Sequence, residues 1–162
     1  MKILCLVGRS GSGKTTVLER WIAFLKGQGY RVGALKHSHH SLPDEPSEKD
    51  SYRLQGGLLS GLATPNGLQL RGDLPWTEIA QWLAERVDLL LVEGGKSTPF
   101  PKIEVLRGQP PLMQESALLA TIGDRLGALP CLPLDDPKAW TEFYTSEASR
   151  NSGISALPKL SS

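Results

Sequence analysis

The chain has 162 residues, enough for one domain with a sizeable hydrophobic core. Hydrophobic residues make up 40% and charged residues 22%, both ordinary for a soluble globular protein. A net charge of +1 gives no overall field for nucleic acid, and no apolar run reaches the ~18 residues that span a bilayer. Neither nucleic acid nor a membrane is therefore an expected partner. Two cysteines far apart in apolar surroundings favour reduced thiols, so we expect a cytoplasmic protein.

The N-terminal part predicts a strand, a helix and a second strand. Residues 2–7, KILCLV, form a short apolar run that ends at Gly8, as in a strand buried on both faces. From Lys14 onward, apolar residues recur at helical spacing until a glycine at position 27. Residues 30–36, YRVGALK, are typical of another strand, and a strand–helix–strand unit predicts a parallel sheet.

A leucine-rich hairpin is predicted next, from residues 58–64 and 68–71 turned at Asn66-Gly67. We expect it at the edge of the parallel sheet. Arg71 is the only charge in its strands, and an uncharged edge invites pairing with another chain, which predicts a homodimer. The alternative is that the chain's own C-terminal segment covers this edge.

The remaining elements complete an α/β fold, a mostly parallel sheet flanked by helices with an antiparallel edge hairpin. They are a short helix at 50–55, helices at 75–87 and 137–148, strands at 88–94, 102–107 and 118–123, and a short last strand at 131–134. We expect one nucleotide-binding domain at residues 1–146. The Ser-rich, aperiodic residues 147–162 are expected to be a flexible tail.

The segment GRSGSGKT, residues 8–15, matches the phosphate-binding pattern G-x-x-x-x-G-K-[ST] between the first strand and the first helix. Its glycines permit positive φ, and the helix N-terminus adds partial positive charge. Lys14 can reach the β- and γ-phosphates, and the Thr15 hydroxyl is placed to ligate Mg²⁺. The alternative is a glycine-rich turn that matches by chance. The residues expected to hold the nucleotide are Gly8, Arg9, Ser10, Gly11, Ser12, Gly13, Lys14, Thr15 and Thr16.

An acidic residue is also expected beside the metal, at the end of a neighbouring strand. Glu93 ends the apolar run LLLV, whereas Asp88 begins the same strand, roughly 16 Å away at ~3.3 Å per residue. Glu93 is therefore a candidate metal ligand together with Thr15, and a candidate catalytic residue together with Lys14. The alternative for Glu93 is a solvated strand-end carboxylate.

All three histidines, His37, His39 and His40, follow the second strand, at the edge where open α/β sheets bind ligands. Together with Lys36 and Lys49 they can bind an anion, such as a second phosphate. Two alternatives stay open, a metal site and loop residues without a binding role.

The blocks GRSGSGKTT, LKHSHH, KDSYRL and DLLLVEGGKSTPFPKIEVLR resemble, in order and spacing, the MobB family of molybdopterin-guanine dinucleotide biosynthesis proteins. The resemblance covers residues 1 to about 137. It implies a P-loop NTPase fold, GTP binding with weak hydrolysis, a homodimer and an accessory role beside the MobA nucleotidyltransferase, acting on the molybdenum cofactor or its pterin precursor.

Residue roles follow from the resemblance as well. It implies that Asp124 accepts hydrogen bonds from guanine. It also implies that one group of residues faces the γ-phosphate, namely Lys36, His37, His39, His40, Lys49 and Asp50. His37 and Asp50 are the candidates for orienting the attacking water. Two other functions remain open, a non-catalytic adaptor that delivers GTP and a P-loop small-molecule kinase.

Overall fold

A computed structural model describes residues 2–38, 59–65, 67–72, 74–150 and 157. The chain divides into a larger unit, Met1–His37 with Ala80–Ser162, and a smaller unit, Ser38–Ile79. The larger unit contains β1 (Ile3–Val7), α1 (Lys14–Gly27), β2 (Val32–Lys36), β5 (Leu89–Glu93), β6 (Lys102–Leu106), η1 (Glu115–Ala117), β7 (Ala120–Gly123), β8 (Cys131–Leu132) and α4 (Pro137–Arg150). The smaller unit contains β3 (Leu59–Thr64), β4 (Gly67–Gly72) and the start of α3 (Trp76–Ala84).

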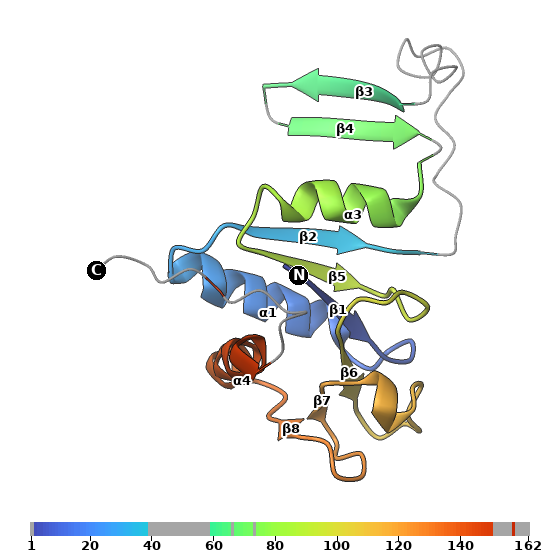
Figure 1. The fold of residues 1–162 in the computed structure, drawn as a ribbon, viewed down its shortest axis with the longest axis vertical. Helices are drawn as coiled ribbons and strands as arrows, with labels where there is room; N and C mark the ends of the chain where they lie inside the picture. The colour runs from blue at the N-terminus through green and yellow to red at the C-terminus, as the bar shows by residue number, and fades with distance from the viewer. Residues whose placement is uncertain (1, 39–58, 66, 73, 151–156, 158–162) are drawn as a thin grey trace. The chain divides into compact units, whose positions relative to one another are not determined.

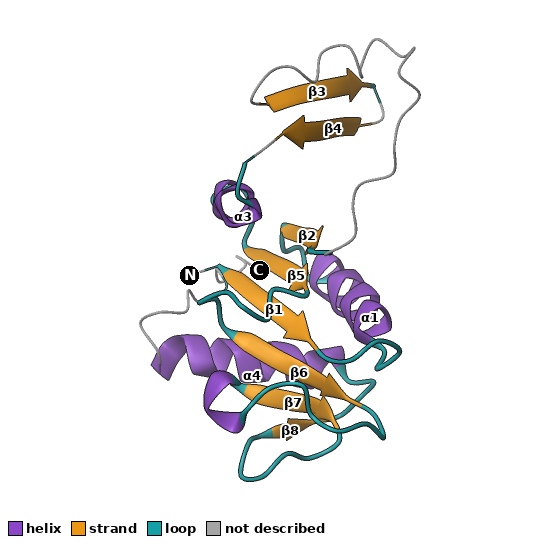
Figure 2. Cartoon of the chain, turned by 90° about the vertical axis from the view of Figure 1, so that its right-hand side faces the viewer, coloured by secondary structure: helices purple, strands orange, loops and turns teal. Residues whose placement is uncertain are grey.

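The larger unit is built on a six-stranded sheet in the order β2-β5-β1-β6-β7-β8. Every neighbouring pair in this sheet is parallel, as the arrows in Figure 2 show. Parallel strands end at the same edge, so the loops after β1, β2, β5, β6 and β7 all leave the sheet there. The predicted parallel α/β fold is confirmed, and this carboxyl edge is where the P-loop and Glu93 lie.

The core explains why the central strands are continuous apolar runs. All residues of β1 and β6 are buried, as are the first four of β5, because helices and loops cover both faces of the sheet. Helices α1 and α4 lie side by side (Figure 1). The rings of Trp21 and Trp140 meet edge to face between them, with 5.7 Å between centroids. Leu157 belongs to the same core. Helix α4 runs to Arg150, and the domain boundary at 146 stays a prediction.

The hairpin of the smaller unit is confirmed, but its expected place is corrected. Strands β3 and β4 pair antiparallel, with Thr64 opposite Gly67. Within the described residues they form a two-stranded sheet of their own and are not an edge of the six-stranded sheet. A favoured turn dipeptide fixes how two strands pair with each other, but it does not determine what their outer edges meet. The predicted helix at residues 50–55 lies outside the described residues.

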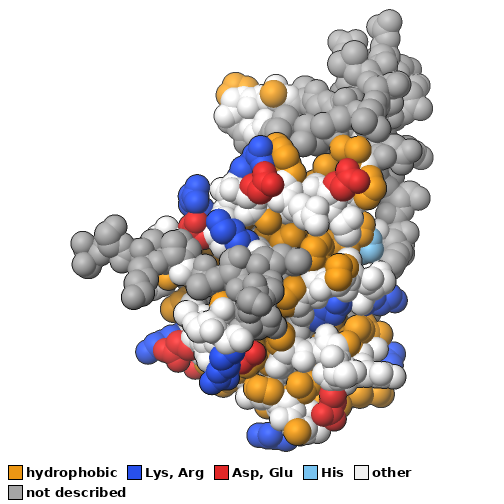
Figure 3. All heavy atoms as spheres, in the orientation of Figure 1, with side chains coloured by type: hydrophobic (Ala, Val, Ile, Leu, Met, Phe, Trp, Pro, Cys, Tyr) orange, Lys and Arg blue, Asp and Glu red, His pale blue; other side chains and the backbone are white. Residues whose placement is uncertain are grey.

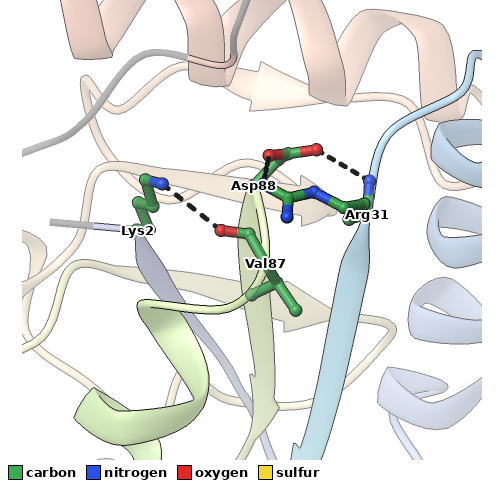
Figure 4. Close-up of polar contacts among 4 residues, drawn as sticks. All are labelled: Lys2, Arg31, Val87 and Asp88. Atoms are coloured by element: carbon green, nitrogen blue, oxygen red, sulfur yellow. Dashed lines mark hydrogen bonds and ion pairs between the residues drawn. The ribbon is translucent and has the colours of Figure 1, made fainter.

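Asp88 lies at the amino edge of the main sheet, as expected, and forms an ion pair with Arg31 (Figure 4). The Asp88 carboxylate accepts hydrogen bonds from the backbone N–H and the guanidinium of Arg31, both at 2.8 Å. The hydrogen bond from Arg31 is the main reason that the pKa of Asp88 lies below its usual range. The ammonium of Lys2 donates to the carbonyl of Val87 at 3.4 Å. These contacts tie the starts of β1, β2 and β5 together.

The same edge carries a cavity of about 430 Å³ lined by Lys2, Ile3, Gln81, Ala84 and Glu85. Hydrophobic side chains gather on the surface around the start of β1 (Figure 3).

In the part of the chain that the structure describes, no helix is long and apolar enough to cross a membrane.

Candidate functional site

The segment between β1 and α1 forms a loop that requires its glycines. Gly8, Gly11 and Gly13 have φ angles of +144°, +77° and +97°, a region that side chains rarely adopt. A Cβ on Gly8 would also lie 2.6 Å from the carbonyl oxygen of Val105 in β6. The glycines of the sequence pattern therefore stand at backbone positions that need glycine, as a phosphate-binding loop requires.

The start of α1 is free to receive an anion. In the described structure no side chain caps this end at Gly13, and the first turn contains no acidic residue. The first N–H groups of a helix have no partner within the helix, and the helix dipole makes this end partially positive. Backbone donors and the helix dipole together would favour an anion beside Lys14 and Thr15.

Polar side chains from three elements meet at this point. The hydroxyl of Thr15 donates to the Glu93 carboxylate at 2.7 Å, and the ammonium of Lys36 lies 3.4 Å from the same carboxylate. The ammonium of Lys14 donates to the carbonyl of Arg9 at 2.7 Å, within the loop itself. The structure thus brings Thr15, Glu93 and Lys36 together at the carboxyl edge of the sheet.

Hydroxyl and carboxylate oxygens are the ligands that Mg²⁺ prefers, so Thr15 and Glu93 fit a Mg²⁺ ion bound together with phosphate. Among the described residues, no group of three or more His, Cys, Asp and Glu side chains could hold a metal ion by itself. A metal here would need ligand atoms from a phosphate or water as well, which is the usual way that Mg²⁺ is held.

The histidine segment is described only at its beginning. The backbone N–H of His37 donates to the carbonyl of Glu93 at 2.9 Å, which keeps His37 beside the end of β5. A Cβ on Gly94 would lie 2.8 Å from the His37 carbonyl, so a glycine is required at this close approach. His39, His40, Lys49 and Asp50 lie outside the described residues, and the proposed roles of this segment stay predictions.

The loop after β6, residues 107–114, contacts the P-loop. This contact was not predicted from the sequence. The Arg9 guanidinium donates to the carbonyls of Pro110, at 2.8 Å, and Pro111, at 3.5 Å. The side-chain amide of Gln109 donates to the Ser10 carbonyl at 3.3 Å. These contacts assign Arg9 and Ser10 to the support of the loop, in addition to their expected place near phosphate.

Glu104 anchors this loop from inside the sheet. It is fully buried in β6, and its carboxylate accepts hydrogen bonds from the backbone N–H groups of Leu112, at 2.5 Å, and Met113, at 3.1 Å. A charged residue at the centre of a strand buried on both faces was the signal available in the sequence, because a buried carboxylate requires hydrogen-bond donors.

Asp124 follows β7 at the same carboxyl edge. One oxygen of its carboxylate accepts a hydrogen bond from the backbone N–H of Gly108 at 2.5 Å. Asp124 therefore holds the turn after β6, and its expected role in guanine recognition stays a prediction.

A parallel sheet, a glycine loop leading into an uncapped helix, and an acidic strand end facing that helix define the P-loop NTPase fold class. The chain matches the family described as "MobB: Molybdopterin guanine dinucleotide synthesis protein B" over residues 3–124, and it belongs to this family.

Several proteins and solved structures are similar to the chain. It is 38% identical over 108 residues to the molybdopterin-guanine dinucleotide biosynthesis adapter protein of Haemophilus influenzae, covering 62% of the chain and 61% of that protein. The probable adapter protein of Bacillus subtilis is 31% identical over 162 residues, covering 90% and 92%. The chain thus spans less than two thirds of the Haemophilus protein but most of the Bacillus one.

Among solved structures, a MobB protein homolog from Bacillus stearothermophilus has a TM-score of 0.61 and 25% identity, covering 93% of this chain and 100% of that one. Bacillus subtilis MobB has a TM-score of 0.60 and 30% identity, covering 86% and 93%. The resemblance stated from the sequence motifs is confirmed.

Proposed function

We propose that the chain binds GTP with Mg²⁺ at the P-loop, hydrolyses it weakly at most, and acts as an adapter in molybdopterin-guanine dinucleotide biosynthesis. The observation that carries the nucleotide part is the contact between Thr15 and Glu93 at the uncapped start of α1, where Lys14 also lies. The adapter part rests on membership of the MobB family and on the similarity to adapter proteins of molybdopterin-guanine dinucleotide biosynthesis.

Phosphate binding would exchange contacts that already exist. The Lys14 ammonium would leave the Arg9 carbonyl for phosphate oxygens, replacing a contact with a neutral acceptor by a contact with a charged one. Thr15 and Glu93 would hold Mg²⁺, which when bound supplies positive charge beside the β- and γ-phosphates. Of the two candidates for orienting a water molecule, His37 is described and lies beside Glu93.

The expected partners follow the family. A MobA-type nucleotidyltransferase would receive the nucleotide, and the molybdenum cofactor or its pterin precursor would present a phosphate to Lys36 and the histidine segment. The exposed ammonium of Lys36, held 3.4 Å from Glu93, supports an anion site next to the P-loop. A second copy of the chain is the remaining expected partner, and light scattering at micromolar concentration tests this homodimer.

The test of nucleotide binding is a titration of the Lys14→Ala variant with GTP. A contact with a charged group contributes about 1.5–3 kcal/mol, so affinity should fall at least tenfold. The matched control is Lys26→Ala, an exposed lysine in the last turn of the same helix, which should leave affinity unchanged. Equal GTP affinity for the Lys14 variant and the wild type would refute the P-loop assignment.

Phosphate release with and without the nucleotidyltransferase then separates the remaining functions. Slow release that follows GTP binding supports a weak GTPase, whereas binding without release supports a non-catalytic adapter. Transfer of phosphate from ATP to a small-molecule acceptor would support the kinase alternative.

A further inference from the structure

A cavity of about 280 Å³ adjoins the P-loop beside α1. It lies wholly within the larger unit. Its lining residues come from the end of the P-loop, the first two turns of α1, the position after β6 and the segment after β8, and they are Ser12, Gly13, Thr16, Val17, Arg20, Arg107, Leu134 and Asp135. Ser12 is 1% exposed, and its hydroxyl has no hydrogen-bond partner within the described structure. A buried hydroxyl without a partner is costly, so Ser12 has an unmet hydrogen-bonding capacity at the wall of this cavity.

The composition of the cavity suits a nucleoside attached to phosphate. Gly13 and Thr16 belong to the helix start that faces the anion site, so a molecule in the cavity would be continuous with phosphates bound there. Val17 and Leu134 give an apolar surface for a flat ring. Arg20 and Arg107 are exposed, and they supply positive charge for the phosphate nearest the ribose and a planar group for stacking.

The wall that carries Asp135 is held in place by its neighbours. The buried indole of Trp140 donates to the carbonyl of Pro133 at 2.6 Å. The carboxylate of Asp136 accepts a hydrogen bond from the Ala139 N–H at 3.0 Å and caps the start of α4. Asp135 itself makes no hydrogen bond or ion pair with any described residue, so its carboxylate is available to a ligand. The Asp124 carboxylate, by contrast, is engaged by the backbone of Gly108.

We infer that this cavity holds the base and ribose of the bound nucleotide, and that Asp135, rather than Asp124, recognises guanine. The inference rests on the proposed nucleotide binding. Guanine presents two adjacent donors, N1–H and the N2 amino group, which a carboxylate accepts together. Adenine presents a lone pair at N1, which would face the carboxylate unpaired, so a free Asp135 selects guanine.

The experiment changes the hydrogen-bonding groups of the side chain and of the base together. Xanthine has a carbonyl at C2 where guanine has its amino group, so it pairs with a side-chain amide instead of a carboxylate. Affinities for GTP and XTP are measured for the wild type, Asp135→Asn and the matched variant Asp124→Asn. We expect Asp135→Asn to bind GTP at least tenfold more weakly than the wild type and to prefer XTP. Asp124→Asn should keep the preference for GTP.

The outcomes distinguish this inference from the proposed function. If Asp135→Asn still prefers GTP, the assignment of Asp135 is overturned, whatever Asp124→Asn does. If Asp124→Asn alone turns to XTP, guanine binding stands and the base is read by Asp124. If the wild type binds neither GTP nor XTP, the proposed function itself fails before the variants are compared. Unfolding midpoints of both variants check that each is folded, which is expected because Asp124 and Asp135 are both exposed.

Discussion

The replacement of Glu104 by Gln tests whether a buried carboxylate supports the P-loop from behind. Glu104 is fully buried, and its two oxygens each accept one backbone N–H from the loop after β6. A hydrogen bond to a charged group contributes about 1.5–3 kcal/mol. Gln keeps one acceptor but turns an amino group toward the other N–H, so the free energy of unfolding should fall by about 2–3 kcal/mol.

Urea unfolding measures this loss directly. With a slope of about 2 kcal/mol per molar urea, typical for a small protein, the midpoint should fall by about 1–1.5 M. The matched control is Glu142→Gln on α4, whose exposed carboxylate lies 3.8 Å from Lys138 and should contribute less than about 1 kcal/mol.

Trypsin provides a local readout, because the exposed Arg107 lies at the start of the loop that Glu104 holds. Cleavage after Arg107 under native conditions should be faster in Glu104→Gln than in the wild type or in Glu142→Gln. GTP affinity should also fall, since Arg9 donates to Pro110 in the same loop. An unchanged urea midpoint together with an unchanged cleavage rate would refute this account of Glu104.

Three further predictions concern protonation and exposure. The pKa of Asp88 is lowered mainly by the hydrogen bond from Arg31, so its stabilisation is complete above the unfolded-state pKa of about 3.9 and disappears as the pH falls through the lower folded-state pKa. Asp88→Asn should therefore cost stability at pH 6 but much less at pH 3 in parallel urea titrations, and a cost independent of pH would contradict this. Burial raises the pKa of Tyr144 to about 12, so absorbance at high pH should show one tyrosine still protonated at pH 11, and its signal should be absent in Tyr144→Phe. Cys5 is fully buried with a raised thiol pKa, whereas Cys131 is partly exposed, so a thiol reagent should label one cysteine in the native protein and two in denaturant.

The parts of the site that the sequence predicted are those fixed by local pattern and by strand direction. The glycine loop was predictable because positive φ angles demand glycine and because an apolar strand precedes it. The contact between Thr15 and Glu93 was predictable because parallel strands end at one edge. Asp88 was correctly placed at the opposite edge by the same reasoning.

The parts that the sequence did not predict depend on loops that meet only after folding. Nothing in the order of residues indicates that Arg9 reaches the carbonyls of Pro110 and Pro111, about a hundred positions away. The position of Asp135 depends on Trp140, a residue of α4 that anchors the preceding segment through Pro133. Helix α3 ends at Ala84, whereas the sequence predicted its end at residue 87. Apolar residues continue at helical spacing beyond Ala84, but the helix does not.

The described contacts at the carboxyl edge also bear on how a nucleotide would be accommodated. Lys14 is bonded to a backbone carbonyl of its own loop, and Glu93 to Thr15 and Lys36. Each of these partners is one that a phosphate or Mg²⁺ can replace without leaving a buried polar group unpaired, because the Lys14 and Thr15 groups would gain charged or metal partners in exchange. The contacts made by Glu104 and Trp140 are of the opposite kind, buried and without an alternative partner. The site therefore combines exchangeable contacts where ligand would bind with fixed contacts behind them. That combination would let the loop receive a ligand without refolding, which would keep the ordering cost of binding low.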